Sequence, residues 1–197
     1  MKYLLTIIVS ILLWNCAAAD EELKFDIIKG KKTLGELQVA KFPNQNGFDI
    51  HIESQIKFWF FGTRRLIYSI YNNFKESYLL TAGSKSTLND KTRHETSITK
   101  ESNQYTFKDL HENETHFCDT SRIRYTIGYM YFKEPTHINK VYSERYLEYL
   151  PIEKVEEHRY KIILPNGTKN YFKYVNGIAV EVEVNHTLAK FYFKKKN

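Results

Sequence analysis

The stretch RIRYTIGYMYFKEP, residues 122–135, can be read with two periodicities, and the choice between them decides the predicted fold. A period of two places Tyr129 and Tyr131 on one buried face of a strand and turns Met130 away from it. A helical period instead places Ile127, Met130 and Tyr131 in one buried stripe. The two interpretations therefore disagree about Met130.

The residues that flank this stretch favour the helix. Residues 119–121, Asp-Thr-Ser, are all good N-cap types, and Pro135 stands where a helix commonly ends. Tyrosine, isoleucine and threonine favour a strand, and Gly128 favours neither structure. Because the cap and the stop agree with each other, we predict one short helix over residues 121–132.

The rest of the chain alternates like antiparallel β-structure. Apolar residues recur at every second position in 48–61 and again in 66–74, with polar residues between them. Near the C-terminus, Asn176-Gly177 separates two alternating runs, which is the strongest short-range hairpin signal. Further turns are predicted at 30–32 and 165–167.

These patterns predict a mainly β fold of roughly eight or more antiparallel strands. A flat open sheet of that size would leave unprotected edges, so we expect a strongly curved sheet or a barrel. The short helix would pack on the concave face and close the core.

Residues 1–19 have the pattern of a signal peptide, with Lys2 before an apolar run and three alanines at the end. The apolar run spans about ten residues, whereas a membrane-spanning helix needs roughly twenty. We therefore predict an exported chain, periplasmic or secreted, with a single mature domain over 20–197 and no transmembrane segment. The alternative, a lipid anchor on Cys16, is less well supported because Trp14 and Asn15 stand where small residues are expected.

Charge and cysteine content exclude some classes of function. Removal of Lys2 with the signal lowers the net charge from +6 to +5. Basic and acidic residues are interleaved, so the concentrated basic face that nucleic-acid binding needs is missing. Cys118 is then the one cysteine of the mature chain and has no partner for an internal disulfide.

No motif predicts catalysis, a metal or a cofactor. The segment HENETHFCD, residues 111–119, holds metal-ligand residue types, but their spacing matches no zinc pattern. His94 and Glu95 are neighbours on a predicted strand and would face opposite ways, so they would not act together. The serines Ser84 and Ser86 lack the glycine placement of a nucleophile elbow. We therefore predict a non-enzymatic protein.

The aromatic run Phe58-Trp59-Phe60-Phe61 is the strongest candidate for a binding site. A strand that is solvated on one face should not carry Trp59 and Phe61 on its polar side. The end of this strand is therefore either a covered corner of the core or the mouth of a pocket for an acyl chain or another apolar ligand. The candidate ligand-binding residues are Phe58, Trp59, Phe60, Phe61, Ile127, Met130 and Tyr131.

Four stretches together suggest a family: IGYMYFKEP, VYSERYLEYLP, YKIILPNGTKNYFKY and NGIAVEVEV. They resemble a family of exported bacterial proteins of about this length that is classed as a domain of unknown function. The resemblance implies a secreted β-rich envelope protein and implies no catalytic residue. A weaker likeness, in shape only, is to lipocalins and periplasmic lipoprotein carriers, which bind acyl chains. The predicted function is an envelope protein that binds an apolar or acyl ligand; the alternative is a scaffold with a filled core.

Overall fold

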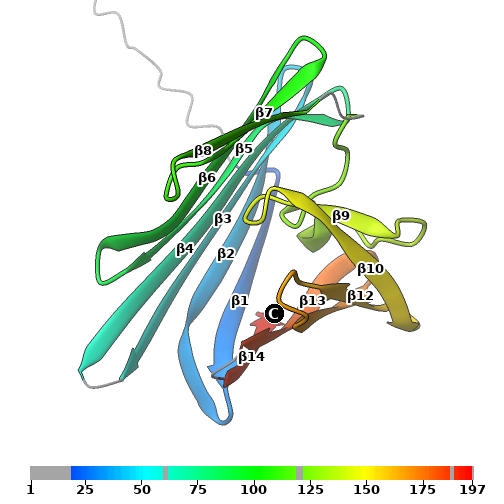
Figure 1. Ribbon diagram of the computed structural model, residues 1–197. Coiled ribbons are helices and arrows are strands. Elements are labelled where there is room, and N and C mark those ends of the chain that lie inside the picture. The colour runs from blue at the N-terminus through cyan, green and yellow to red at the C-terminus, as the bar shows by residue number, and fades with distance from the viewer. Residues whose placement is uncertain (1–18, 60–61, 119–121, 187–188, 197) are drawn as a thin grey trace, which may run out of the picture.

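The structure is a computed structural model that describes residues 19–59, 62–118, 122–186 and 189–196. These residues form a single sheet of 14 strands, in the order β8-β7-β6-β5-β4-β3-β2-β1-β14-β13-β12-β11-β10-β9 (Figure 1). The elements are β1(Glu21–Lys29), β2(Lys32–Asn44), β3(Gly47–Trp59), β4(Thr63–Lys75), β5(Tyr78–Leu88), β6(Lys91–Glu101), β7(Gln104–Asp109), β8(Glu114–Cys118), η1(Tyr129–Tyr131), β9(Lys140–Ser143), β10(Glu148–Glu156), β11(Arg159–Ile163), β12(Lys169–Val175), β13(Ile178–His186) and β14(Ala189–Lys195).

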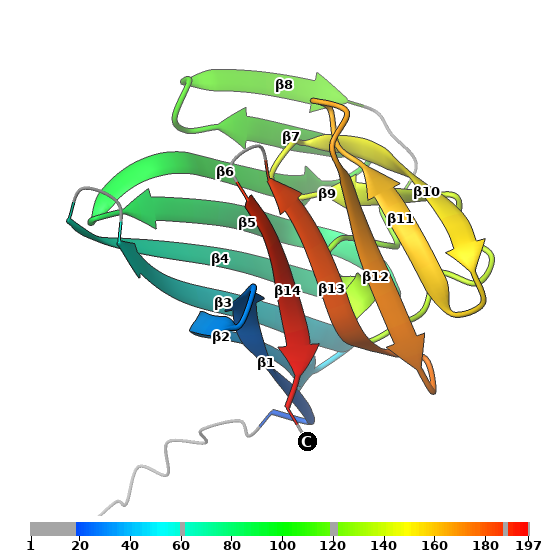
Figure 2. The same ribbon diagram turned by 90° about the horizontal axis from the view of Figure 1, so that it is seen from below.

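Two antiparallel meanders, β1–β8 and β9–β14, make up this sheet. They are joined by the pairing of β1 with β14, in which Phe25 lies opposite Lys195 and Ile28 opposite Tyr192. The sheet bends so that the two meanders face each other (Figures 1 and 2). Within the described residues, β8 and β9 end the strand order and do not pair with each other, so the sheet is curved and open rather than a closed barrel.

The hairpin between β12 and β13 confirms the turn predicted at Asn176-Gly177. Asn176 has φ of 51° and Gly177 has φ of 79°. Two successive positive φ values are typical of a type I′ turn, whose twist matches that of the strands on either side. The residue types in this turn therefore fix the register locally.

The alternation predicted for residues 48–61 is confirmed in β3. Ile50, Ile52 and Ile56 are buried, whereas His51 and Glu53 between them are exposed. We call the side of the sheet that carries the three isoleucines the inner face and the opposite side the outer face. The inner face lines the space between the two meanders, which is where the core lies.

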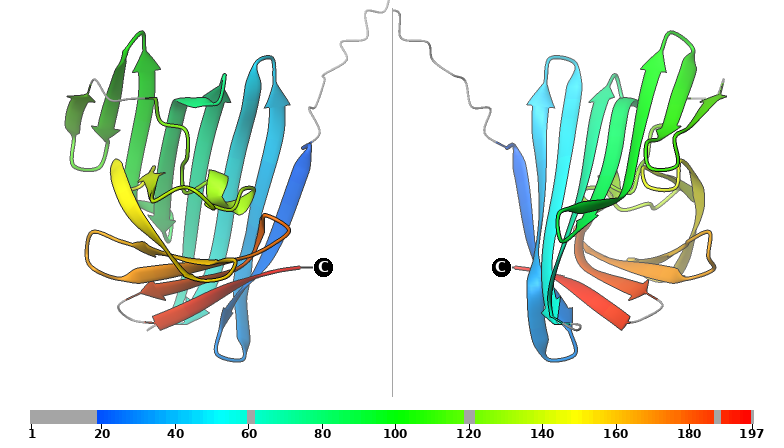
Figure 3. Two further views of the ribbon diagram at one scale, coloured as in Figure 1. Left: turned by 90° about the vertical axis from the view of Figure 1, so that its right-hand side faces the viewer. Right: turned by 60° about the vertical axis from the view of Figure 1, so that its left-hand side comes forward.

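Residues 122–139, here called the plug segment, connect β8 to β9 and run between the two meanders (Figure 3). The helix predicted over residues 121–132 is not formed. Among the described residues of the segment, the one helical element is the single 3-10 turn η1. The predicted N-cap residues 119–121 lie outside the described residues.

The backbone of the plug segment is bonded to other parts of the molecule. The Ile127 amide donates to the carbonyl of Tyr142 at 3.1 Å, and the Tyr142 amide donates to the carbonyl of Tyr125 at 2.9 Å. The Ile123 amide donates to the hydroxyl of Tyr105 at 3.2 Å. Since these groups are satisfied by other elements, tertiary contacts override the local helix signals.

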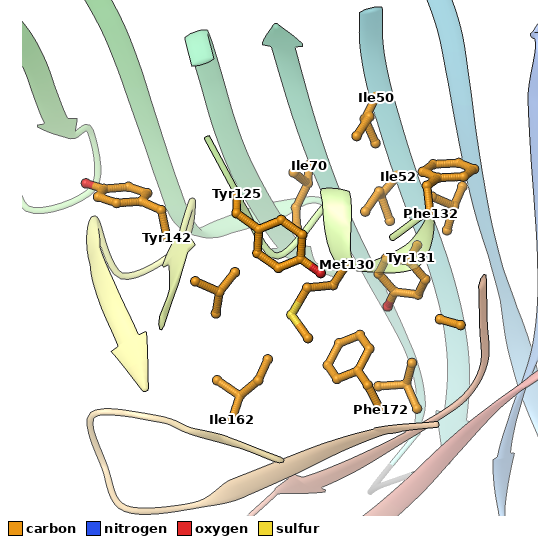
Figure 4. Packing of buried hydrophobic residues seen from close by; sticks show 14 of the residues in the cluster. Ile50, Ile52, Ile70, Tyr125, Met130, Tyr131, Phe132, Tyr142, Ile162 and Phe172 are labelled. Carbon is orange, nitrogen blue, oxygen red and sulfur yellow. The ribbon is translucent and has the colours of Figure 1, made fainter. Parts of the chain in front are cut away.

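Met130 lies inside the core and is 0% exposed. Figure 4 shows it between the meanders, close to Ile162 and Phe172. The ring of the adjacent Tyr131 meets Phe25 edge-on at 5.5 Å and Phe172 at 5.7 Å between centroids. The burial of Met130 agrees with the helical interpretation even though the backbone is irregular.

Candidate functional site

A buried polar network binds the plug segment to the inner face of the sheet. At its centre is Glu144, which follows β9 and is 0% exposed. Its Oε1 accepts hydrogen bonds from the Gly128 amide at 2.9 Å and from Asn72 Nδ2 at 3.0 Å. Within the described part of the chain, Oε2 of Glu144 is buried and has no hydrogen-bond partner.

Asn72 comes from the inner face of β4 and also bonds the plug segment directly. Its Oδ1 accepts from Thr126 Oγ1 at 2.7 Å, and that hydroxyl accepts from the Tyr129 amide at 3.2 Å. A Cβ on Gly128 would stand 2.7 Å from Asn72 Oδ1 and 3.1 Å from Glu144 Oε1. The glycine is therefore required for the close approach of the backbone to this network.

Burial controls the electrostatics of the network. Removal from water raises the pKa of Glu144 above its usual value, against the opposing effect of the hydrogen bond from Gly128. Burial likewise raises the pKa of Tyr131, with the nearby Glu144 adding to the effect. Burial therefore makes the neutral form of the Glu144 carboxyl group more favourable in the fold than it is in water.

A second branch of the network runs along β5 and β6. Thr96 Oγ1 donates to the backbone carbonyl of Glu144 at 2.6 Å and lies 3.0 Å from Ser84 Oγ. His94 Nε2 lies 3.2 Å from the same Ser84 oxygen, and burial lowers the pKa of His94. Glu95 lies on the outer face beside Lys85, whereas His94 lies on the inner face beside Ser84, so the two side chains point away from each other as the alternation predicts. This branch connects the backbone of Glu144, just after β9, to the inner face of β5 and β6.

The far end of the plug segment is held by Glu134. Its Oε1 accepts a hydrogen bond from the hydroxyl of Tyr160 at 2.9 Å, and His158 Nδ1 lies 3.1 Å from it. Burial, followed by the hydrogen bond to Glu134, raises the pKa of Tyr160 to about 12. The plug segment is thus bound to the first meander through Asn72 and to the second meander through Glu144 and Tyr160.

The structure does not bring the predicted ligand-binding residues together at one site. Met130 and Tyr131 are buried in the core, Ile127 and Phe58 are half-buried, Trp59 is 78% exposed, and Phe60 and Phe61 lie outside the described residues. The prediction that this strand end is a covered corner of the core is therefore wrong for its outer face, where Trp59 is exposed.

The register shows how far the plug segment reaches along β3. The Tyr129 ring packs on Phe48 at 5.0 Å, and Tyr131 contacts Phe25, which shares a transverse row with Ser54. Phe58 lies about four residues beyond Ser54, or roughly 13 Å at about 3.3 Å per residue. The plug segment therefore covers the inner face from Phe48 to Ser54 and stops short of Phe58.

Beyond the plug segment, five apolar side chains of the inner face are only half-buried. We call them the open end: Phe58, Leu66, Val184, Phe191 and Phe193. Phe193 lies opposite the buried Val182, and Phe191 lies opposite Val184, so β13 and β14 present them on the inner face. Two meanders thus contribute half-covered aromatic and aliphatic groups to one end of the interior.

The polar network was not predicted from the sequence, although the sequence carries one signal for it. Asn72 occupies an inner position of β4 between Ile70 and Phe74, where an apolar residue is expected. A polar side chain at such a position must find a buried partner. Nothing in the sequence identifies that partner as Glu144, because the two lie on separate elements.

The described part of the chain has neither a cluster of metal-ligand side chains nor a membrane-spanning helix. In the described ranges, no group of three or more His, Cys, Asp or Glu side chains could hold a metal ion. In the predicted metal-ligand segment, His116 Nε2 lies 3.4 Å from Glu114 Oε2, and both side chains are exposed. Over the same ranges, no helix has the length and apolar character to cross a membrane.

Comparisons with known proteins bear on the fold and the family. The family model described as a domain of unknown function, DUF6134, matches residues 25–196. No curated protein matches the chain. Among solved structures, a beta-barrel-like protein of domain of unknown function DUF1849 from Brucella abortus is similar, with a TM-score of 0.57 and 9% sequence identity over 89% of this chain and 95% of that chain. At this identity the likeness shows the fold alone.

Proposed function

The chain belongs to the DUF6134 family of domains of unknown function, and we propose that it is an exported, non-enzymatic protein that binds an apolar or acyl ligand at its open end. The predicted resemblance to a domain of unknown function is confirmed by this membership. The single observation that supports ligand binding is the half-buried state of the apolar side chains beyond the plug segment. Half-covered aromatic groups at the mouth of a barrel-like fold are typical surroundings for an apolar ligand.

The proposed ligand enters the interior from the end that the plug segment leaves uncovered. Its apolar part contacts Phe58, Phe191 and Phe193, which come from both meanders. Complete burial of one such side chain is worth about 1.5–3 kcal/mol, and burial of the ligand's own apolar surface adds to the part that these half-buried side chains still gain. The network around Glu144 fixes how deep a ligand can reach.

We expect Phe58→Ser to weaken binding of palmitate at least about tenfold, because it removes one large apolar contact. The matched control is Trp59→Ser, which changes the next residue on the outer face and should leave the Kd within about twofold of the wild type. Isothermal titration calorimetry on the mature protein measures both values. Equal losses in the two variants, or no palmitate binding at all, would disprove the open end as the site.

The second candidate function is a scaffold with a filled core and no ligand. Complete burial of Met130 and the extent of the plug segment favour it, because they fill the centre of the interior. Native mass spectrometry of protein purified from its own envelope distinguishes the two functions. A lipid that copurifies supports the binding protein, whereas a repeatedly empty protein supports the scaffold.

Export makes its own prediction about the N-terminus. Because the alanines before Asp20 suit ordinary signal cleavage better than Cys16 suits acylation, we expect a mature chain that begins near Asp20 and is recovered without detergent. Mass spectrometry of the secreted chain measures its first residue. Fatty-acid labelling that disappears in Cys16→Ala would show a lipid anchor instead.

A further inference from the structure

The outer face of the sheet carries a hollow of about 430 Å³, here called the outer groove, which crosses β1 to β6. This volume lies within the range of about 300–1,000 Å³ that is typical of small-molecule sites. Its floor consists of small residues, Ala40, Ser69 and Gly83, which come from three different strands. Larger side chains around them form its walls, so the hollow is a direct result of the sequence of the outer face.

Strand register divides the lining of the outer groove into two parallel rows. One row runs Ala40, His51, Tyr71 and Gly83 across β2, β3, β4 and β5. The second runs Gln38, Glu53, Ser69 and Lys85 across the same strands. The two rows lie two residues apart, roughly 7 Å, and neighbouring side chains within a row lie about 4.8 Å apart.

The first row offers an aromatic surface. The rings of His51 and Tyr71 meet edge-on with centroids 5.5 Å apart. The Tyr71 hydroxyl lies 3.0 Å from Thr81 Oγ1, which restrains the ring, and Tyr71 is 42% exposed. Because Gly83 beside it has no side chain, the ring is accessible from within the groove.

The second row offers polar groups of alternating type: an amide, a carboxylate, a hydroxyl and an ammonium group. Lys85 Nζ is held by Glu95 Oε2 at 2.9 Å, which also lines the groove. Glu53 is exposed and has no ion pair within the described residues, so its oxygens can accept hydrogen bonds from a ligand. With Glu22 also in the lining, the groove holds more acidic than basic groups, although the chain as a whole carries +6.

We propose that the outer groove binds a neutral oligosaccharide. A pyranose ring has one face of polarised C–H groups, which suits the negative face of an aromatic ring, and an edge of hydroxyls, which suits alternating donors and acceptors. The aromatic row of the groove would contact the C–H face of the sugar, and the polar row would bond its hydroxyls. An oligosaccharide that lies across the strands meets one polar side chain per strand, whereas the acidic lining repels an anionic polymer.

The test uses the mature protein and three neutral sugars, cellotetraose, tetra-N-acetylchitotetraose and maltotetraose, with spermine as a cationic probe. We expect saturable binding of at least one sugar by NMR titration, with the shifted signals confined to β1–β6. Tyr71→Ala and Glu53→Ala should each weaken that binding about tenfold, since each removes one contact. Tyr146→Ala, a tyrosine of similar exposure at 37%, is the matched control and should change the Kd less than about twofold.

A third variant tests whether the ligand lies in the outer groove by blocking the groove rather than by removing a contact. Ser69→Phe fills the floor of the outer groove from the outer face and should abolish sugar binding while the urea midpoint stays within the error of the wild type. Binding of spermine without any of the three sugars would overturn the proposal in favour of a cation site. No binding of any sugar, or equal weakening by Tyr71→Ala and Tyr146→Ala, would also overturn it.

Discussion

Replacement of Met130 by alanine is expected to lower the free energy of unfolding by about 2–5 kcal/mol. Met130 is 0% exposed and lies between the two meanders, so its loss leaves a cavity that neighbouring side chains can fill only partly. Urea unfolding followed by circular dichroism gives the free energies. The expected loss is a large fraction of the total stability of a typical domain, which is about 5–15 kcal/mol.

Two further variants make this result specific. Tyr129→Ala removes a half-buried ring that packs on Phe48 and Phe74 and should destabilise the protein as well. Tyr146→Ala removes an exposed ring and should change stability by less than about 0.5 kcal/mol. A near-neutral Met130→Ala beside a damaging Tyr129→Ala would mean that the plug segment presents its other face to the core.

Glu144→Ala should destabilise the protein by about 2–6 kcal/mol, because two buried donors lose their acceptor at about 1–3 kcal/mol each. These donors are the Gly128 amide and Asn72 Nδ2. Glu144→Gln is the matched control, since the glutamine side chain keeps an oxygen at the position of Oε1. Equal stability of the two variants would show that the bonds to Glu144 contribute nothing to the fold.

The same glutamine variant predicts a change in pH dependence. The pKa of Glu144 is raised in the folded state above 4.5, so above pH 4.5 the unfolded chain binds fewer protons at this residue than the folded chain. Its contribution to stability is complete below pH 4.5 and decreases as the pH rises, by at most about 1.4 kcal/mol per pH unit, until the folded pKa is passed. Urea midpoints between pH 5 and 8 should therefore fall more steeply in the wild type than in Glu144→Gln.

His94 lies in the same network and acts in the opposite direction. Its pKa is lowered by burial, so its contribution to stability is complete above its ordinary pKa of 6.5 and is lost as the pH falls. Subtraction of the Glu144→Gln profile from that of the wild type removes this common background. Parallel profiles would contradict a raised pKa at Glu144.

The strands and their turns could be predicted from local sequence because their signals lie within a few residues. The alternation around Ile50 and Ile52 identifies the inner face of β3, and Asn176-Gly177 fixes the turn between β12 and β13. Both features depend on backbone preferences and on a period of two, which need no knowledge of distant residues. The mainly β class and the strong curvature followed from them.

The plug segment could not be predicted in the same way. Its amides donate hydrogen bonds to Tyr142, Tyr105 and Glu144, which all lie outside residues 122–135. Local cap and stop signals therefore predicted a helix where distant partners impose an irregular path. The helical period nevertheless predicted correctly that Met130 and Tyr131 are buried, because burial depends on the apolar character of a side chain more than on the type of backbone that carries it.

Because β1 pairs with β14, the sheet cannot be completed until the last strand of the chain has been synthesised. β1 is the first strand in chain order and β14 the last, yet they lie side by side in the middle of the sheet. Until β14 has been synthesised, one edge of β1 stays open and can pair with another chain. At about 5–20 residues per second this period is on the order of 10 to 30 s, so nascent chains are exposed to aggregation for as long as the ribosome needs to complete them.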